Sequence, residues 1–228
     1  MANERYLKAS AVKSKKTSRE KLFFRRIPVH ILEPLPESVD LDMCLKKIEG
    51  LIPQFFVKNI DVIYVGQFEH LSDNGVNASY NEGAIYLTNM QDDNDDIIDD
   101  IVHEIAHAVE EIYQEHVYRD KEVEEEFRGK RERLYYILGD TMPPGTNFPL
   151  EQYQDVEYNK DFDEFLYKEM GYPVLASITS GLFYSPYAIT ALREYFANGF
   201  EAYFLRKDLN SLRTISPHLF NKLDELTY

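Results

Sequence analysis

The sequence is poor in cysteine and in long apolar runs. Cys44 is the only cysteine among 228 residues, so no disulfide can form within the chain. A reducing, intracellular setting is therefore expected, which leaves non-classical export or association with a virion open. No apolar run approaches the roughly 20 residues that a membrane-spanning helix needs. The first 16 residues carry charges but lack the apolar segment of a secretory signal, and membrane binding is not predicted.

Basic residues are scarce after position 26. The chain has 25 Lys and Arg against 40 Asp and Glu, a net charge of −15, yet residues 1–26 hold nine basic and two acidic residues. The acidic remainder argues against nucleic acid as the main partner. We interpret residues 1–26 as a basic, flexible arm that is solvated or lies on the protein's own acidic surface. Binding of nucleic acid or an acidic partner by this arm is the alternative.

The composition suits one domain, which we place at residues 27–228. A hydrophobic fraction of 44%, with 17 Tyr and 14 Phe but no Trp, is enough for one sizeable core. Segments rich in β-branched and aromatic residues predict short strands at 27–32, 59–68 and 84–88. Apolar residues at helical spacing predict helices over 38–52, 91–118, 191–208 and 216–226, with Ser38 capping the first. The expected fold class is α+β, mostly helical, with a small mixed sheet.

The segment IVHEIAHAVEE, residues 101–111, carries the chemistry. His103 and His107 are four residues apart on a predicted helix, so they share one face and can bind one metal ion. A catalytic zinc ion takes three protein ligands and a water molecule. Glu104 follows the first histidine and would accept the proton of that water, as in the H-E-x-x-H pattern. A charged helix that happens to contain two histidines is the alternative.

The residues around this pattern favour the metal site. The same helix has a continuous apolar face, as a helix that carries a buried metal ion requires. Aspartates crowd its beginning at 92, 93, 95, 96, 99 and 100. We interpret them as capping residues at the positive end of the helix dipole, because the twelve-residue loop of a calcium site is missing. For the third ligand, Glu194 and Glu201 in the segment REYFANGFEAYF are the candidates, and Glu194 has the more apolar neighbours.

Three stretches together carry a resemblance to a known family. They are VGQFEHLSDNGVNASYNEGAIYLTN, HEIAHAVEE and SPYAITALREYFANGFEAYF, within residues 55–112 and 180–207. They resemble the catalytic domain of the anthrax lethal factor family of zinc peptidases, which includes the Pro-Pro endopeptidases. The resemblance implies that Glu194, which opens an E-[YF]-F-A segment, is the third zinc ligand. It also implies that Tyr187, seven residues earlier, directs its hydroxyl at the metal site and stabilises an oxyanion; a core tyrosine is the alternative.

Two features depart from the family pattern. Relatives commonly have a second glutamate four residues after the ligand, where this chain has Asn198. The 86 residues between His107 and Glu194 are also more than the family leads us to expect. Helical, charged segments fill much of this interval, and we interpret residues 113–180 as a helical insertion.

The sequence thus predicts a zinc-dependent metalloendopeptidase that acts on a protein or peptide substrate. Zn²⁺ would be bound by His103, His107 and Glu194, with Glu104 and Tyr187 as catalytic residues. The strand at 84–88 is expected to be the sheet edge along which an extended substrate lies, with an inner strand as the alternative. Two other functions fit the same residues: a non-catalytic zinc-binding structural or interaction protein, and a toxin-like effector with one protein target. The sequence does not indicate an oligomeric state.

Overall fold

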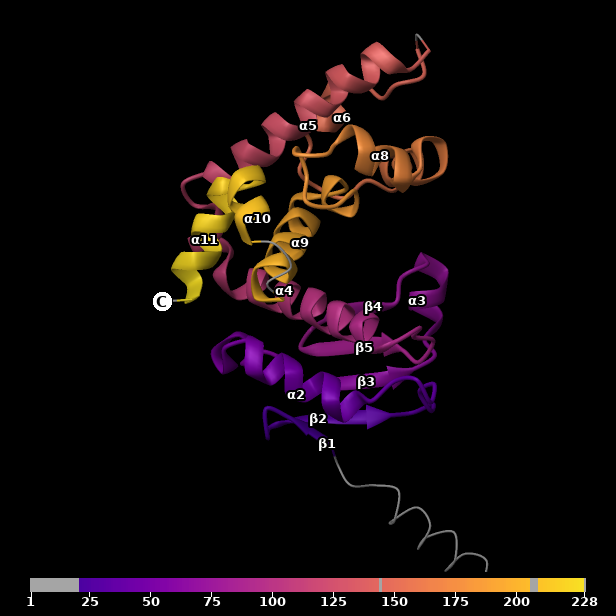
Figure 1. Cartoon of the computed structure of the whole chain (residues 1–228), viewed down its shortest axis with the longest axis vertical. Coiled ribbons are helices and arrows are strands. Elements are labelled where there is room, and N and C mark those ends of the chain that lie inside the picture. The colour runs from indigo at the N-terminus through magenta and orange to yellow at the C-terminus, as the bar shows by residue number, and fades with distance from the viewer. Residues whose placement is uncertain (1–20, 144, 206–208, 228) are drawn as a thin grey trace, which may run out of the picture.

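The protein has a five-stranded mixed sheet below a larger helical part (Figure 1). The computed structural model describes residues 21–143, 145–205 and 209–227. The strands follow the order β1-β2-β3-β5-β4. Adjacent β2, β3 and β5 are parallel, whereas β1 and β4 pair antiparallel at the two sides. The strands are β1 (Lys21–Phe23), β2 (Ile27–Ile31), β3 (Val62–Gly66), β4 (Ala78–Asn81) and β5 (Ala84–Thr88). The predicted α+β class with a small mixed sheet is confirmed.

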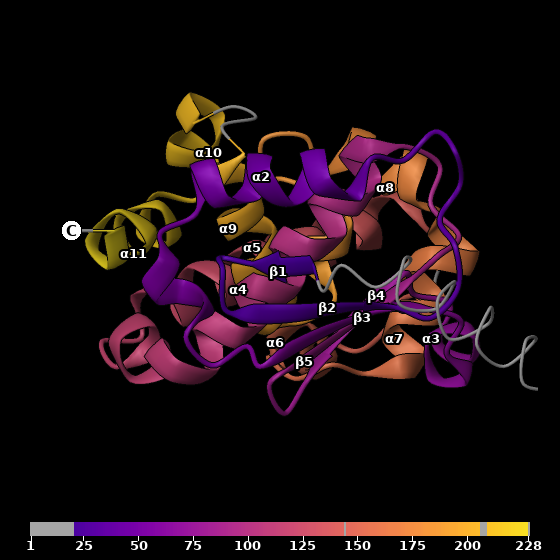
Figure 2. The same ribbon diagram turned by 90° about the horizontal axis from the view of Figure 1, so that it is seen from below.

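Helices α2 (Leu41–Leu51) and α4 (Asn94–Tyr118) pack against each other and cover one face of the sheet (Figure 2). The inward residues of the strands and the apolar face of α4 form the main core, in which Ile63, Ile85 and Ile101 are fully buried. This arrangement follows from the period-two alternation of the strands and the three-and-four spacing of the helix. No helix in the described part of the chain is long and apolar enough to cross a membrane.

The expectation that residues 84–88 form the sheet edge was wrong. The strand β5 lies between β3 and β4, and β4 is the outer strand on this side. The segment before β5 contains the short helix α3 (Glu69–Asn74) and then β4. Glu82 and Gly83 both have positive φ, 45° and 83°, as a tight two-residue hairpin requires. That hairpin folds β4 back along β5 and moves the edge by one strand.

The helix that carries the histidines begins as its sequence predicts. Asp93 is the N-cap of α4, and its carboxylate accepts hydrogen bonds from the backbone N–H groups of Asp95 and Asp96. This capping explains part of the aspartate cluster without a bound ion. For α2, however, the cap predicted at Ser38 was wrong. Asp40 is the N-cap there and accepts from Met43, because the helix begins at Leu41.

The remaining helices lie mostly on the far side of α4 from the sheet (Figure 1). They are α5 (Glu122–Thr141), α6 (Leu150–Gln154), α7 (Lys160–Glu164), α8 (Tyr172–Ile178), α9 (Leu192–Phe204), α10 (Leu209–Ile215) and α11 (Pro217–Thr227). Short helical turns complete them: η1 (Gln54–Val57), η2 (Phe165–Met170) and η3 (Tyr187–Ile189). That residues 113–180 are an insertion stays a prediction. The predicted basic arm lies largely outside the described residues, although positions 21–26 form β1 and its turn.

A buried polar cluster fixes α9 against α5 and the C-terminal helices. Lys130 donates hydrogen bonds to the hydroxyls of Tyr195, at 2.5 Å, and Ser216, at 2.8 Å. The Tyr195 hydroxyl donates to Glu126, which also accepts from the backbone N–H of His218 at the start of α11. Each of these polar side chains therefore has a hydrogen-bond partner, as buried polar groups generally do. Tyr195 follows Glu194 directly in α9. The cluster therefore also fixes the helix that carries Glu194.

Close packing of α9 on α11 predicts opposite effects for two Gly→Ala substitutions. A Cβ built on Gly199 would lie 2.3 Å from Leu219 Cδ2, and Leu219 is fully buried. We expect Gly199→Ala to lower the free energy of unfolding by about 1–3 kcal/mol through overpacking. Gly129 in α5 has open space at the same position, so Gly129→Ala should raise it by about 0.5–1 kcal/mol. Urea titrations measure the free energy of unfolding of both variants. If that free energy were unchanged in Gly199→Ala, the close packing of α9 on α11 would be contradicted.

Candidate metal centre

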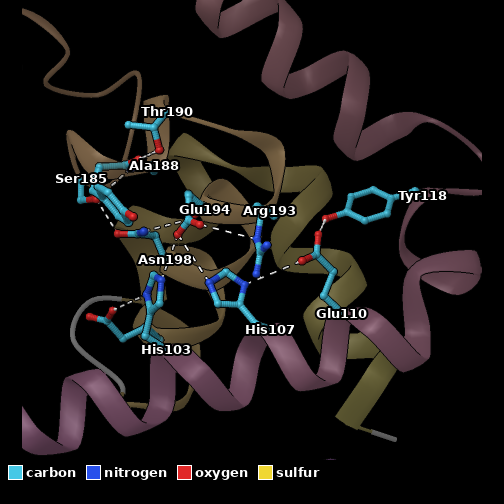
Figure 3. A network of polar contacts seen from close by, with 12 residues as sticks. His103, His107, Glu110, Tyr118, Ser185, Ala188, Thr190, Arg193, Glu194 and Asn198 are labelled. Carbon is cyan, nitrogen blue, oxygen red and sulfur yellow. Dashed lines mark hydrogen bonds and ion pairs between the residues drawn. The ribbon is translucent and has the colours of Figure 1, made fainter. Parts of the chain in front are cut away.

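Two imidazoles from α4 point toward one carboxylate from α9 (Figure 3). The Nε2 atom of His103 lies 3.0 Å from Glu194 Oε2, and the Nε2 atom of His107 lies 3.6 Å from the same oxygen. Metal-ligand atoms of the three residues lie within 4.8 Å of one another. Glu194 lies 91 positions after His103 in the sequence. The crossing of α4 and α9 brings the three predicted residues together. They form a group that could hold a metal ion.

Burial rules out the alternative of a solvated helix that merely contains histidines. Both His107 and Glu194 are only 7% exposed, and Glu104 is 6% exposed. Charged groups are costly to bury unless they are paired or bind a metal. The flanking Ile105 and Ala106 are fully buried, so the same helix face that builds the core also places the histidines inside the protein.

The charges of this group depend strongly on each other. Burial alone would raise the pKa of Glu194, but its contacts with His103 and His107 outweigh burial and hold the pKa well below its usual range. Burial would likewise lower the pKa of His103, yet hydrogen bonds with Glu194 and Glu201 raise it to about 10. The pKa of His107 is also raised, against the effect of burial, by Glu110 and Glu194. The two imidazoles thus hold protons firmly beside the carboxylate.

Each imidazole has a second carboxylate on its other nitrogen. The Nδ1 atom of His103 lies 3.6 Å from Glu201 Oε2, and Nδ1 of His107 lies 3.9 Å from Glu110 Oε2. The Tyr118 hydroxyl donates a hydrogen bond to Glu110. At 3.9 Å the contact with Glu110 is an ion pair, and Nδ1 of His107 has no hydrogen-bond partner among the described residues. Such outer carboxylates orient histidines that bind metals.

Glu104 lies beside the three-residue group and outside it. Its carboxyl accepts a hydrogen bond from the backbone N–H of Tyr80 in β4, and burial raises its pKa against this and against the nearby histidines. The strand β4 therefore touches the site directly, although the sequence had suggested β5. A carboxyl group with a raised pKa next to a cluster of imidazoles is suited to proton transfer.

Tyr187 faces the same group from the opposite part of the fold. Its ring centroid lies 6.0 Å from that of His103. It is half-buried in η3, and burial together with the charge of Glu194 raises the pKa of its hydroxyl. The structure thus places Tyr187 near His103, where the family resemblance had suggested it. The catalytic role of Tyr187 stays a prediction.

A cavity of about 360 Å³ opens beside His107. One wall comes from β4 and its turn, another from the second half of α4. The lining of the cavity is mainly acidic. It includes three carboxylates, of Glu82, Glu110 and Glu111, and one guanidinium, of Arg193. The Tyr80 hydroxyl donates to Glu111 at 2.7 Å and joins the two walls. The site is thus accessible from a hollow next to its second histidine.

Sequence reasoning missed some of the residues that support the site. Glu110 follows His107 by three residues on a helix, a spacing that places both on one face and could have identified it. Ser185 and Tyr80 gave no such signal, because their contacts with Asn198 and Glu104 depend on how separate elements pack. Glu201, the alternative third ligand, lies on the far nitrogen of His103 and is not part of the three-residue group.

Comparisons with known proteins give no further assignment. A scan against protein-family models, a search of curated proteins and a search of solved structures each found no match for this chain. The resemblance to the lethal factor family therefore remains a prediction from the quoted motifs.

The firmly held protons predict how metal binding depends on pH. A metal ion must displace the proton of His103, whose pKa is about 10. The apparent affinity should therefore rise about tenfold per pH unit, for each proton displaced, across the whole interval from pH 6 to 8. A histidine with the ordinary pKa of about 6.5 would give a curve that levels off near pH 7.5. Competition with a chelator at pH 6, 7 and 8 measures this, and a flat profile from 7 to 8 would refute it.

Proposed function

We propose that this protein is a zinc-dependent metallopeptidase that hydrolyses peptide bonds in a protein or peptide substrate. The observation that carries the proposal is the buried group of His103, His107 and Glu194, with the carboxyl of Glu104 beside it. Two imidazoles and one carboxylate form the donor set of many catalytic zinc sites, in which a fourth position stays open. The lethal factor-like motifs in the sequence support the same function.

The three residues fit zinc by chemistry and by spacing. Ligand atoms placed tetrahedrally at about 2.0–2.1 Å from one ion lie roughly 3.4 Å from each other. The two Nε2–Oε2 separations here are 3.0 and 3.6 Å, which agree with that value. Zn²⁺ held by these residues would supply Lewis acidity, which lowers the pKa of water toward about 7 and polarises a carbonyl.

The chain's own residues would carry the proton and stabilise charge. Glu104 accepts a proton from the attacking water as general base and returns it to the leaving amine. Its raised pKa favours this exchange, because a carboxyl of ordinary acidity holds a proton poorly near neutral pH. Tyr187 keeps its hydroxyl proton, since its pKa is raised, and can donate a hydrogen bond to the oxygen that becomes negative in the transition state.

The sheet edge gives the substrate a place to bind. β4 is the outer strand next to α4, and Glu104 accepts a hydrogen bond from its Tyr80 N–H. An extended segment added alongside β4 would gain main-chain hydrogen bonds and pass the metal group. The cavity beside His107 would then receive part of the substrate. We propose β4 for the role that the sequence had suggested for 84–88.

Replacement of Glu104 tests the hydrolytic function directly. We expect Glu104→Gln to lower the cleavage rate of a peptide substrate by 10²-fold or more, because an amide cannot accept the water's proton. Zinc content should be unchanged, since Glu104 is not among the three ligands. Zinc content by atomic absorption and turnover of a peptide library provide the two measurements.

Glu115→Gln is the matched control, because Glu115 is an exposed residue of the same helix. It should behave as the unmodified protein. Zinc binding without cleavage by any form would favour the alternative of a zinc-binding structural or interaction protein. Cleavage within about threefold of the unmodified rate in Glu104→Gln would show that another group is the base.

Tyr187→Phe separates stabilisation of the transition state from packing. The substitution removes only the hydroxyl, so we expect kcat to fall about 10- to 10³-fold, with zinc affinity and Tm nearly unchanged. Steady-state kinetics and thermal melts measure the three quantities. Tyr167→Phe, at a tyrosine that is 60% exposed, is the control. If Tm dropped sharply while the rate stayed intact, Tyr187 would be a structural tyrosine.

A further inference from the structure

Both polar atoms of the Asn198 amide form hydrogen bonds with groups other than the histidines. Its Nδ2 donates to the Glu194 carbonyl at 2.9 Å, and its Oδ1 accepts from Ser185 Oγ at 2.5 Å. Asn198 is only 9% exposed. Ser185 Oγ also accepts from the backbone N–H of Ala188, at 3.3 Å. Asn198 therefore ties α9 to the turn that contains Tyr187 and supports neither imidazole (Figure 3).

Glu201 lies beside the Nδ1 atom of His103. It lies on α9 seven residues after Glu194, so two helical turns separate residues on a similar face. Its Oε2 is 3.6 Å from Nδ1 of His103, whereas Nε2 of the same ring is 3.0 Å from Glu194. The two carboxylates thus contact different nitrogens of one imidazole. Glu201 is 18% exposed at its side chain, which limits solvent screening of this contact.

We propose that Glu201 is the positioning residue of His103. A carboxylate beside Nδ1–H fixes the tautomer, so that the lone pair of Nε2 faces the metal, and it raises the basicity of the ring. The inference rests on the zinc binding of the proposed function and does not depend on peptide hydrolysis.

The surroundings of positions 198 and 201 favour a carboxylate at 201. A carboxylate at 198 would be buried one turn from Glu194, and it could not donate to the Glu194 carbonyl as the amide does. The neutral amide keeps that donor and adds no negative charge. On the other side of the ring, Glu201 forms an ion pair with His103 at a partly exposed place, where the charge is less costly to desolvate.

Zinc affinity of three single variants tests the inference. We expect Glu201→Gln to bind zinc about 10- to 100-fold more weakly than the unmodified protein, as is typical when an outer-shell partner of a histidine is lost. Asn198→Ala should stay within about threefold, because its hydrogen bonds reach Ser185 and a backbone carbonyl. Glu225→Gln is the matched control: Glu225 lies 3.5 Å from His116, an exposed pair outside the site.

Affinities come from competition with a chelator on the full chain, and the rise in Tm on adding zinc gives a second readout. That rise should shrink in Glu201→Gln alone, because ligand stabilisation depends on the ratio of zinc to Kd. A merely structural role would lower the Tm of the metal-free protein and leave the zinc affinity intact. The inference is overturned if Glu201→Gln binds zinc within threefold of the unmodified protein, or if Asn198→Ala weakens binding equally. If no peptide were cleaved, the proposed peptidase function would be refuted. The order of the zinc affinities of these variants would still test the role of Glu201.

Discussion

The site depends on one crossing, that of α4 over α9. Only this contact brings Glu194 to the two histidines, because 86 residues of chain separate them in sequence. On another side of α9, Gly199 lets this helix pack closely on Leu219 of α11. The Lys130 cluster connects α9 to α5 and to Ser216. The contacts that fix α9 therefore also fix the position of Glu194 relative to His103 and His107.

Electrostatic compensation explains the composition of the surrounding shell. Glu194, His103 and His107 are buried or nearly so, and each contacts an oppositely charged partner. Glu201 and Glu110 add carboxylates at the outer edges of the two rings. Such a group tolerates burial because it can share protons or a metal ion, whereas any one member alone would be costly. The carboxylates of Glu194, Glu201 and Glu110 thus balance the charge of two imidazoles that hold protons.

The sequence predicted most of what is local and less of what depends on packing. The spacing of apolar residues predicted α4, and local enrichment in β-branched and aromatic residues predicted the strands β2, β3 and β5. The ligand Glu194 was proposed from a motif. The sheet order was missed because one hairpin, at Glu82 and Gly83, decides which strand is outermost. The Asn198–Ser185 link was missed because no spacing rule connects separate elements.

The corrected sheet edge makes the proposed mechanism more consistent. With β4 as the edge, the strand that could pair with a substrate also donates its Tyr80 N–H to Glu104. Substrate pairing and the position of the general base are then properties of one strand.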